Sequence, residues 1–204
     1  MDKNYWIDYY KKNKAPKQPS LFAMNIINIL QPQKKLLELG CGNGRDSIFF
    51  ANKGILVTGI DQAESSIRKL NEEHTDITFL LDDFVNTNLF NENNYDYIYS
   101  RFSMHSISLE DEKKLLNKAY KSLKNDGKIF IEARSIKDDF YGLGEKIGKN
   151  EYIYEKHYRR FIEINETEKY MKEIGYKIEL CVEDKGFAVY KNQDPVVIRI
   201  IASK

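Results

Sequence analysis

Cysteine is scarce in this sequence, because the 204 residues contain only Cys41 and Cys181. Two cysteines provide neither a disulfide framework nor the ligand spacing of a metal site, so we expect a reduced protein without metal. Net charge is also small, with 32 basic against 31 acidic side chains, which argues against a broad nucleic-acid or membrane-surface footprint. Bilayer-length apolar runs and a signal-peptide pattern are both lacking. The sequence therefore predicts a cytoplasmic protein that has no transmembrane segment and binds no nucleic acid.

Glycine is uncommon overall, yet three glycines cluster in the most informative stretch, from Leu36 to Ser47. An apolar run of leucines predicts a buried parallel strand, and a helical run follows near Ile48. Between them the glycines stand in the pattern G-x-G-x-G, which lets backbone N–H groups approach a ligand without Cβ clashes. A dinucleotide-binding turn would instead have the spacing G-x-G-x-x-G. The stretch therefore predicts a ligand-binding turn of a different kind.

Alternating strands and helices organise the rest of the chain. The sequence predicts further strands over 55–61, 77–81, 95–100, 128–133, 176–182 and 195–202, and Gly186–Tyr190 could extend the last pair. Amphipathic runs predict helices between them, with a turn at 125–127. This order is typical of an α/β fold. We predict one domain over 1–204, with a Rossmann-like seven-stranded sheet, helices on both faces and the last strand antiparallel.

Capping signals and aromatic spacing describe the helix ends and the N-terminal region. Ser20 can cap a helix over 21–30, and a capping-box spacing begins at Asn165 ahead of a helix that stops at Gly175. Before them, residues 3–13 carry aromatic side chains four positions apart. This aromatic face could pack on the sheet, or residues 1–31 could form a helical lid over the ligand pocket.

Two further segments are expected to shape the site. Asp61 ends the second predicted strand, where an acid could accept hydrogen bonds from ribose hydroxyls or cap the helix over 62–73. Residues 135–162 form the least regular segment, and a connection of about thirty residues exceeds an ordinary loop. We therefore expect this insertion to shape a substrate site.

Several local motifs resemble one branch of a known enzyme family. Glu38 followed by the glycine turn resembles motif I of class I S-adenosylmethionine (SAM) methyltransferases. Other motifs are similar to methyltransferases of bacterial surface-polysaccharide (O-antigen or capsule) biosynthesis that methylate a terminal phosphate: Tyr5-Trp6, Leu39 to Ser47, Ser100-Arg101-Phe102 with His105, Glu132 to Ser135, Asp138/Asp139 before Tyr141-Gly142, and His157 to Phe161. The resemblance implies SAM as the cofactor and S-adenosylhomocysteine as its product.

The resemblance also implies the residues that hold this cofactor. An acid after the third strand would take the adenine amino group, and Asp82 and Asp83 are both candidates, with the Phe84 backbone N–H meeting the ring. The full set of implied cofactor residues is Glu38, Gly40, Cys41, Gly42, Arg45, Asp61, Gln62, Asp82, Asp83, Phe84 and Arg101. Cys41 fits the turn because it is small, so we expect no nucleophilic role for its thiol.

The chemistry of methyl transfer bears on the acceptor. A hydroxyl acceptor needs a base or a metal, whereas a phosphate oxygen is already anionic and needs only orientation and partial neutralisation by Arg and His. Such groups gather after the fourth strand and in the insertion. We predict catalytic roles for His105, Arg134 and His157, and substrate contacts from Tyr141, Tyr158, Arg159 and Arg160.

Alternatives stand beside several of these roles. His105 could be a packed core histidine, a base or only a hydrogen-bond donor to phosphate. Arg159 and Arg160 are adjacent, so one of them is expected to point away from the pocket and form a salt bridge.

The preferred function is SAM-dependent O-methylation of an anionic phosphate-type oxygen of a phosphorylated saccharide, a nucleotide-linked precursor or a phosphoramidate in surface-polysaccharide biosynthesis. A methyltransferase of a small non-phosphorylated acceptor, of the tellurite-resistance kind, is the main alternative. An NAD-binding oxidoreductase and a non-catalytic SAM-binding module are further alternatives. The oligomeric state cannot be deduced from the sequence.

Overall fold

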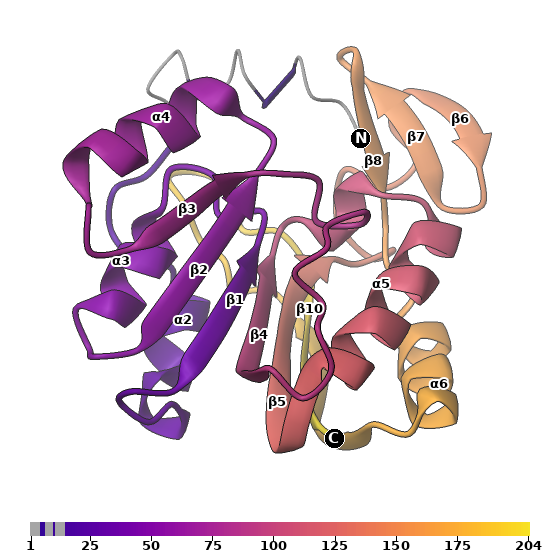
Figure 1. The fold of residues 1–204 in the computed structure, drawn as a ribbon. Helices are drawn as coiled ribbons and strands as arrows, with labels where there is room; N and C mark the ends of the chain where they lie inside the picture. The colour runs from indigo at the N-terminus through magenta and orange to yellow at the C-terminus, as the bar shows by residue number, and fades with distance from the viewer. Residues whose placement is uncertain (1–4, 7–9, 11–14) are drawn as a thin grey trace.

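A computed structural model describes residues 5–6, 10 and 15–204, and a seven-stranded sheet runs through its centre (Figure 1). The strand order is β3-β2-β1-β4-β5-β10-β9. β10 pairs antiparallel with both of its neighbours, whereas the other pairs of adjacent strands are parallel. The predicted Rossmann-like sheet is confirmed. Its strands are β1 (Lys35–Leu39), β2 (Leu56–Asp61), β3 (Thr78–Leu81), β4 (Tyr95–Arg101), β5 (Leu123–Arg134), β9 (Lys177–Asp184) and β10 (Val197–Ser203).

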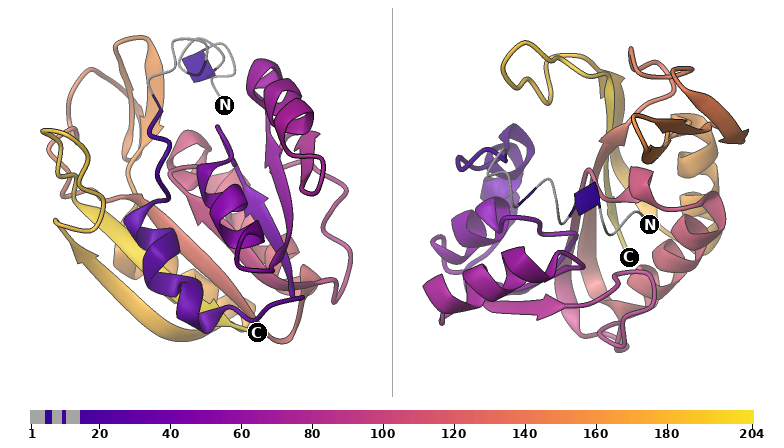
Figure 2. Two further views of the ribbon diagram at one scale, coloured as in Figure 1. Left: turned by 90° about the vertical axis from the view of Figure 1, so that its left-hand side faces the viewer. Right: turned by 90° about the horizontal axis from the view of Figure 1, so that it is seen from above.

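Helices cover both faces of this sheet (Figure 2). They are α2 (Leu21–Ile26), η1 (Ile27–Ile29), α3 (Arg45–Ala51), α4 (Glu64–Glu73), η2 (Met104–Ser106), α5 (Leu109–Ser122) and α6 (Ile164–Ile174). One apolar cluster joins α2, α3 and α4 to the sheet, and a second joins α5 and α6 to its other face. Because both faces are covered, β1 buries its leucines completely, as a strand at the centre of a parallel sheet must. None of the helices in the described part of the chain is long and apolar enough to cross a membrane.

Helix ends follow the predicted capping signals in part. Ser20 caps α2 by accepting a hydrogen bond from the Ala23 amide at 3.0 Å, although the helix changes to a 3-10 turn after Ile26. The capping box predicted at Asn165 is wrong. α6 begins one residue earlier, and the carboxylate of Glu163 accepts hydrogen bonds from the Asn165 and Glu166 amides at 3.2 and 2.7 Å.

The insertion is more regular than its sequence suggests. It folds into a three-stranded antiparallel sheet, with β6 (Glu145–Gly148), β7 (Glu151–Tyr154) and β8 (His157–Arg160). Two-residue turns join these strands, and Asn150, Glu155 and Lys156 have positive φ there. Such turns match the strand twist but usually contain glycine, so their sequence signal is weak here. The expectation of an irregular segment over 135–162 is therefore wrong.

Two smaller expectations also need correction. Gly186–Tyr190 adds no strand to the sheet, since Tyr190 forms only an isolated bridge with Gln193. β5 runs through the turn predicted at 125–127, with Asp126 at φ +62° and a shift of register opposite β4.

Candidate functional site

A cleft of about 1170 Å³ opens over the carboxyl ends of the central strands. In an α/β sheet this edge is where ligands bind. The N-terminal segment, the loops after β1, β2 and β4, the insertion and the loop 188–195 surround the cleft. Seen from above, the insertion and the 188–195 loop both extend past the edge of the sheet (Figure 2, right).

The glycine turn closes one end of the cleft. Gly40, Gly42 and Gly44 have φ of +77°, +57° and +74°, a region that side chains disfavour. Space is short as well, because a Cβ on Gly40 would lie 2.7 Å from the Ser103 Cβ. A Cβ on Gly42 would contact the Tyr10 hydroxyl, which is the end of a long side chain that could shift. Conformation therefore favours glycine at all three positions, and packing requires it at Gly40.

Asp61 links the glycine turn to the next helix. Its carboxylate accepts hydrogen bonds from the Gly42 and Ala63 amides, each at 2.8 Å. The pKa of Asp61 is raised above its ordinary value, because burial raises it more than these hydrogen bonds lower it. Asp61 does not cap α4, because Ala63 holds the N-cap position and no side chain makes a capping hydrogen bond there, so that alternative is wrong. Asp61 lines the cleft beside Gln62, which leaves the ribose role open to it.

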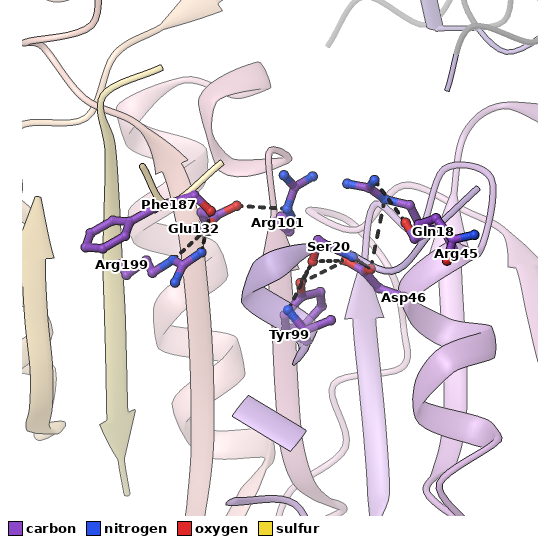
Figure 3. Close-up of polar contacts among 10 residues, drawn as sticks. Gln18, Ser20, Arg45, Asp46, Tyr99, Arg101, Glu132, Phe187 and Arg199 are labelled. Carbon is purple, nitrogen blue, oxygen red and sulfur yellow. Dashed lines mark hydrogen bonds and ion pairs between the residues drawn. The ribbon is translucent and has the colours of Figure 1, made fainter. Parts of the chain in front are cut away.

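A buried polar network connects the N-terminal segment to the glycine-turn end of the cleft (Figure 3). Asp46 accepts hydrogen bonds from the Ser20 amide and hydroxyl, both at 2.7 Å, and from the Tyr99 hydroxyl at 2.9 Å. Glu38 accepts a hydrogen bond from the Ser47 hydroxyl, and its burial raises its pKa well above the ordinary value. Asp46, Ser20 and Tyr99 were not predicted as site residues, because no local motif connects positions so far apart.

Two guanidinium groups face the cleft above the sheet (Figure 3). Arg101 Nε lies 2.8 Å from Glu132, whose other oxygen accepts from Arg199 Nε at 2.7 Å. Arg45 donates to the Gln18 carbonyl at 3.2 Å. Burial and the nearby charge of Arg101 lower the pKa of Arg45. Two close cations at one end of the cleft can hold a carboxylate or another small anion.

The acids after β3 lie beside this end but do not line it. Asp82 accepts hydrogen bonds from the Asp83 amide and the Thr87 hydroxyl, at 2.7 and 2.5 Å. Asp83 accepts from the Val85 amide at 2.9 Å. Phe84, in contrast, lines the cleft. Both carboxylates thus shape the loop that presents Phe84.

A second group of basic side chains lies on the insertion side. Arg134 donates to both oxygens of Asp138 at 2.9 Å, and its guanidinium stands 5.0 Å from the Phe140 ring centre. Arg159 lies 5.6 Å from the same ring and donates to the Tyr154 carbonyl at 3.2 Å. Arg134 and Arg159 therefore flank one aromatic ring and both line the cleft.

His105 and His157 complete this side of the cleft. His157 is buried and stacks on the Tyr5 ring at a centroid distance of 3.7 Å. His105 is also buried, and within the described part of the chain its Nδ1 has no hydrogen-bond partner. Burial, followed by the charges of Arg134, His157, Arg159 and Arg160, lowers the pKa of His105 well below its usual value. His105 is therefore a neutral imidazole at neutral pH.

Most of the predicted site residues come together in the cleft, and a few lie elsewhere. Those that line it are Glu38, Gly40, Cys41, Arg45, Asp61, Gln62, Phe84, Arg101, His105, Arg134, His157 and Arg159. Gly42 lies beneath Tyr10, and the Tyr141 hydroxyl, at the insertion surface, donates to Asn150 at 3.1 Å. Arg160 is buried and forms an ion pair with Glu112, which is the salt bridge expected of one of the two adjacent arginines. Tyr158 points away from the cleft in the same direction.

Several cleft residues were missed. Phe102 stands in a motif but was not predicted as a site residue, Phe140 has no motif, and the loop 188–195 was taken partly for a strand. The aromatic residues Tyr5, Trp6 and Tyr10 do line the cleft, as a lid would. No group of three or more His, Cys, Asp or Glu side chains in residues 5–6, 10 and 15–204 is arranged to hold a metal ion.

Known proteins resemble this chain in sequence over part of its length. Phosphoethanolamine N-methyltransferase of Plasmodium falciparum is 36% identical over 106 residues, which are 50% of this chain and 40% of that protein. The probable S-adenosyl-L-methionine-dependent methyltransferase TehB of Haemophilus influenzae (strain 10810) is 29% identical over 136 residues, 65% of this chain and 46% of that protein. The chain thus matches less than half the length of these curated relatives.

Solved structures resemble it over nearly the whole chain. A SAM-dependent methyltransferase from Methanosarcina mazei superposes with a TM-score of 0.77 at 16% identity, covering 88% of this chain and 96% of that one. A Burkholderia thailandensis 1,6-didemethyltoxoflavin-N1-methyltransferase, solved with bound 1,6-didemethyltoxoflavin and S-adenosylhomocysteine, has a TM-score of 0.73 at 15% identity, covering 98% of this chain and 85% of that one. Residues 36–127 match the family model described as a methyltransferase domain. This match covers less than half of the chain, and the solved structures show that nearly the whole chain has the fold of the SAM-dependent methyltransferases.

Proposed function

We propose that this protein transfers the methyl group of SAM to an anionic, phosphate-type oxygen of a small phosphorylated acceptor. The observation that carries the proposal is Arg159. Its guanidinium lines the cleft, and among the described residues its only hydrogen bond is to a backbone carbonyl, with no carboxylate partner. A half-buried cation in the cleft that neutral His105 also lines would accommodate one negative charge of an acceptor.

The two ends of the cleft suggest how donor and acceptor would be placed. The residues proposed for SAM are Asp61 and the glycine turn, with Arg45 and Arg101 opposite the methionine carboxylate and Asp82, Asp83 and Phe84 around the adenine. The acceptor anion would then lie between Arg134, Arg159 and His157. SAM supplies an electrophilic methyl group, so the protein has mainly to align the acceptor oxygen with it and exclude water.

Partial neutralisation suits this chemistry. Full ion pairing would weaken the nucleophilic oxygen, and Arg134 already shares its charge with Asp138. A phosphate oxygen carries its charge at neutral pH, so no proton has to be removed before methyl transfer. His105 would then donate a hydrogen bond to the phosphate oxygen rather than act as an obligatory base.

Methyl transfer to the amine of a phosphorylated amine is a second candidate. A phosphoethanolamine N-methyltransferase is among the relatives. His105 lines the cleft as a neutral imidazole that could take the proton of a substrate ammonium group, leaving the nitrogen lone pair free to attack the methyl carbon, and its lowered pKa makes it a weak base for that step. The anion would occupy the same basic side chains.

Two other parts of the proposal concern the chain's organisation and setting. We place the N-terminal region over 1–31 as a cap on the cleft, because Tyr5 stacks on His157 while the Pro16 carbonyl accepts a hydrogen bond from the Asn43 side chain at 2.9 Å. The insertion over 135–162 would form the acceptor side. A role in surface-polysaccharide biosynthesis in the cytoplasm stays a prediction from the sequence resemblance.

Matched acceptor pairs test the function. The protein is incubated with SAM and either a phosphorylated compound or its dephosphorylated counterpart: glucose 1-phosphate against glucose, and phosphoethanolamine against ethanolamine. S-adenosylhomocysteine release and product mass are measured, and tandem mass spectrometry locates the methyl group on oxygen or nitrogen. We expect turnover only with phosphorylated members, and equal turnover within each pair would contradict the phosphate assignment.

Variants then assign the anion site. Arg159→Gln should raise KM for the phosphorylated acceptor by about tenfold to a hundredfold, the loss expected for one charge-assisted contact of about 1.5–3 kcal/mol. The Kd for SAM should not change. Arg68→Gln is the matched control, because Arg68 is an exposed helix cation that lies 3.9 Å from Glu72 and does not line the cleft. An unchanged KM in Arg159→Gln would remove Arg159 from the site.

A further inference from the structure

The strand β8 has two functional faces. Side chains alternate along a strand, so His157 and Arg159 point to one side and line the cleft. Tyr158 and Arg160 point to the other side, where the Tyr158 hydroxyl donates to the Ile107 carbonyl at 3.4 Å. Arg160 Nε donates to the same carbonyl at 2.8 Å. One carbonyl thus receives two donors from this strand.

That carbonyl belongs to the turn that carries His105. η2 is a single 3-10 turn with Met104 and Ile107 at its two ends, and its closing bond from the Ile107 amide to the Met104 carbonyl is long, at 3.4 Å. Arg160 Nη2 lies 3.4 Å from the Met104 carbonyl, so one guanidinium spans both ends of the turn. A lone 3-10 turn has little stability of its own, so contacts from outside must define its position.

A buried carboxylate makes this contact possible. Arg160 and Glu112 are 3% and 1% exposed and form an ion pair, and Glu112 also accepts a hydrogen bond from the Thr167 hydroxyl at 3.3 Å. Apolar side chains of similar size often give at least as much stability as such a pair, so the pair is weak evidence of a stabilising role. A guanidinium fork, in contrast, can hold two carbonyls and one carboxylate in a defined geometry.

We propose that Arg160 is a positioning residue, which holds the His105 turn at a fixed place relative to the cleft-lining face of β8. The proposal rests on the proposed function in one respect only, that His105 faces the acceptor. Arg160 itself does not line the cleft, so it would contact neither SAM nor the acceptor. Through it, the insertion and the loop after β4 would move as one unit, so that His105 keeps its place against His157 and Arg159.

The test separates position from stability with two variants. Arg160→Met/Glu112→Met removes both buried charges together and is expected to fold, since no unpaired charge remains. Arg160→Lys keeps the charge opposite Glu112 but lacks the Nε–H that reaches Ile107. Tyr176→Phe is the control, because it removes a buried hydrogen bond of 3.0 Å to the Leu116 carbonyl of α5, away from the His105 turn.

The first readout needs no acceptor. The chain has only three histidines, so imidazole ¹⁵N–¹H spectra of the full-length protein with S-adenosylhomocysteine can be assigned by single His→Gln variants. We expect the His105 signals to shift and broaden in the double Met variant, and less in Arg160→Lys, while the control keeps the wild-type spectrum. His105 signals identical to wild type in both Arg160 variants would overturn the proposal.

The second readout uses the acceptor found active in the paired screen. A displacement of about 1 Å at a reacting group can cost on the order of a hundredfold in rate, so kcat should fall by about that factor in the double variant while the Kd for SAM stays unchanged. Wild-type kcat in the double variant would also overturn the proposal. If the screen finds no acceptor, the proposed function fails while the imidazole spectra still decide the role of Arg160.

Discussion

Glu132→Gln is expected to destabilise the protein strongly, because this carboxylate is the centre of a buried charge network. Glu132 is completely buried, with Arg101 at 2.8 Å on one oxygen and Arg199 at 2.7 Å on the other. Removing one member of a buried ion pair typically costs about 3–5 kcal/mol. Glutamine keeps the shape and one acceptor oxygen, so we expect the lower end, about 3 kcal/mol. For a chain of this size, that corresponds to a Tm lower by about 6–12 °C.

The measurement is urea unfolding followed by far-UV circular dichroism, with SAM titration calorimetry on the folded variant. Glu168→Gln is the matched control, because Glu168 pairs with Lys172 at 2.8 Å on the surface of α6. An exposed pair four residues apart contributes about 0.3–0.5 kcal/mol. Because Glu132 orients the cleft-lining Arg101 (Figure 3), SAM affinity should fall as well. If Glu132→Gln lowered the free energy of unfolding by less than 1 kcal/mol, the Glu132 charge would not be needed to balance the two arginines, and the reasoning would be refuted.

Three further predictions concern the donor site, His105 and the cap. Asp61→Asn should weaken SAM binding by about tenfold to a hundredfold with the fold retained, and an unchanged Kd by calorimetry would exclude Asp61 from the cofactor site. His105 has a depressed pKa, so below pH about 6.5 the unfolded chain binds a proton that the folded chain does not, and stability falls by up to about 1.4 kcal/mol per pH unit. Urea unfolding at pH 7 and 5.5 should show a smaller fall in His105→Gln, and equal slopes would contradict the shift. Deleting residues 1–14 should reduce both SAM affinity and turnover, whereas wild-type values would show that this segment only packs.

The sequence predicts well that the glycine turn and Asp61 lie together, because the signals for both are local. The glycine turn and Asp61 each stand at the end of a buried apolar strand, and parallel strands bring their carboxyl ends to one edge. The predicted positions of the strands are therefore enough to predict that these residues are neighbours. The N-cap of α2 at Ser20 is likewise a local signal and is confirmed.

The insertion side of the cleft is less predictable for a physical reason. Its geometry depends on β8, and β8 exists because two short turns at positive φ fold the insertion into a sheet. Only this sheet makes Arg159 and Arg160 point to opposite sides, one into the cleft and one to Glu112. The sequence of two adjacent arginines does not indicate which one lines the cleft and which one forms the buried ion pair. The partner Glu112 lies 48 positions away, on a helix whose charged residues are otherwise exposed or partly exposed.

The pairing of charges in the cleft links the small net charge of the chain to an anionic acceptor. Arg101 is matched by Glu132, Arg134 by Asp138, and Arg45 lies 3.9 Å from Asp46, so three cleft arginines have carboxylate neighbours. Arg159 has none among the described residues. Such a cleft would bind a polyanion poorly, because each paired guanidinium would have to give up its carboxylate. One small anion matches it better, so an acceptor with a single phosphate group is the form that this arrangement favours.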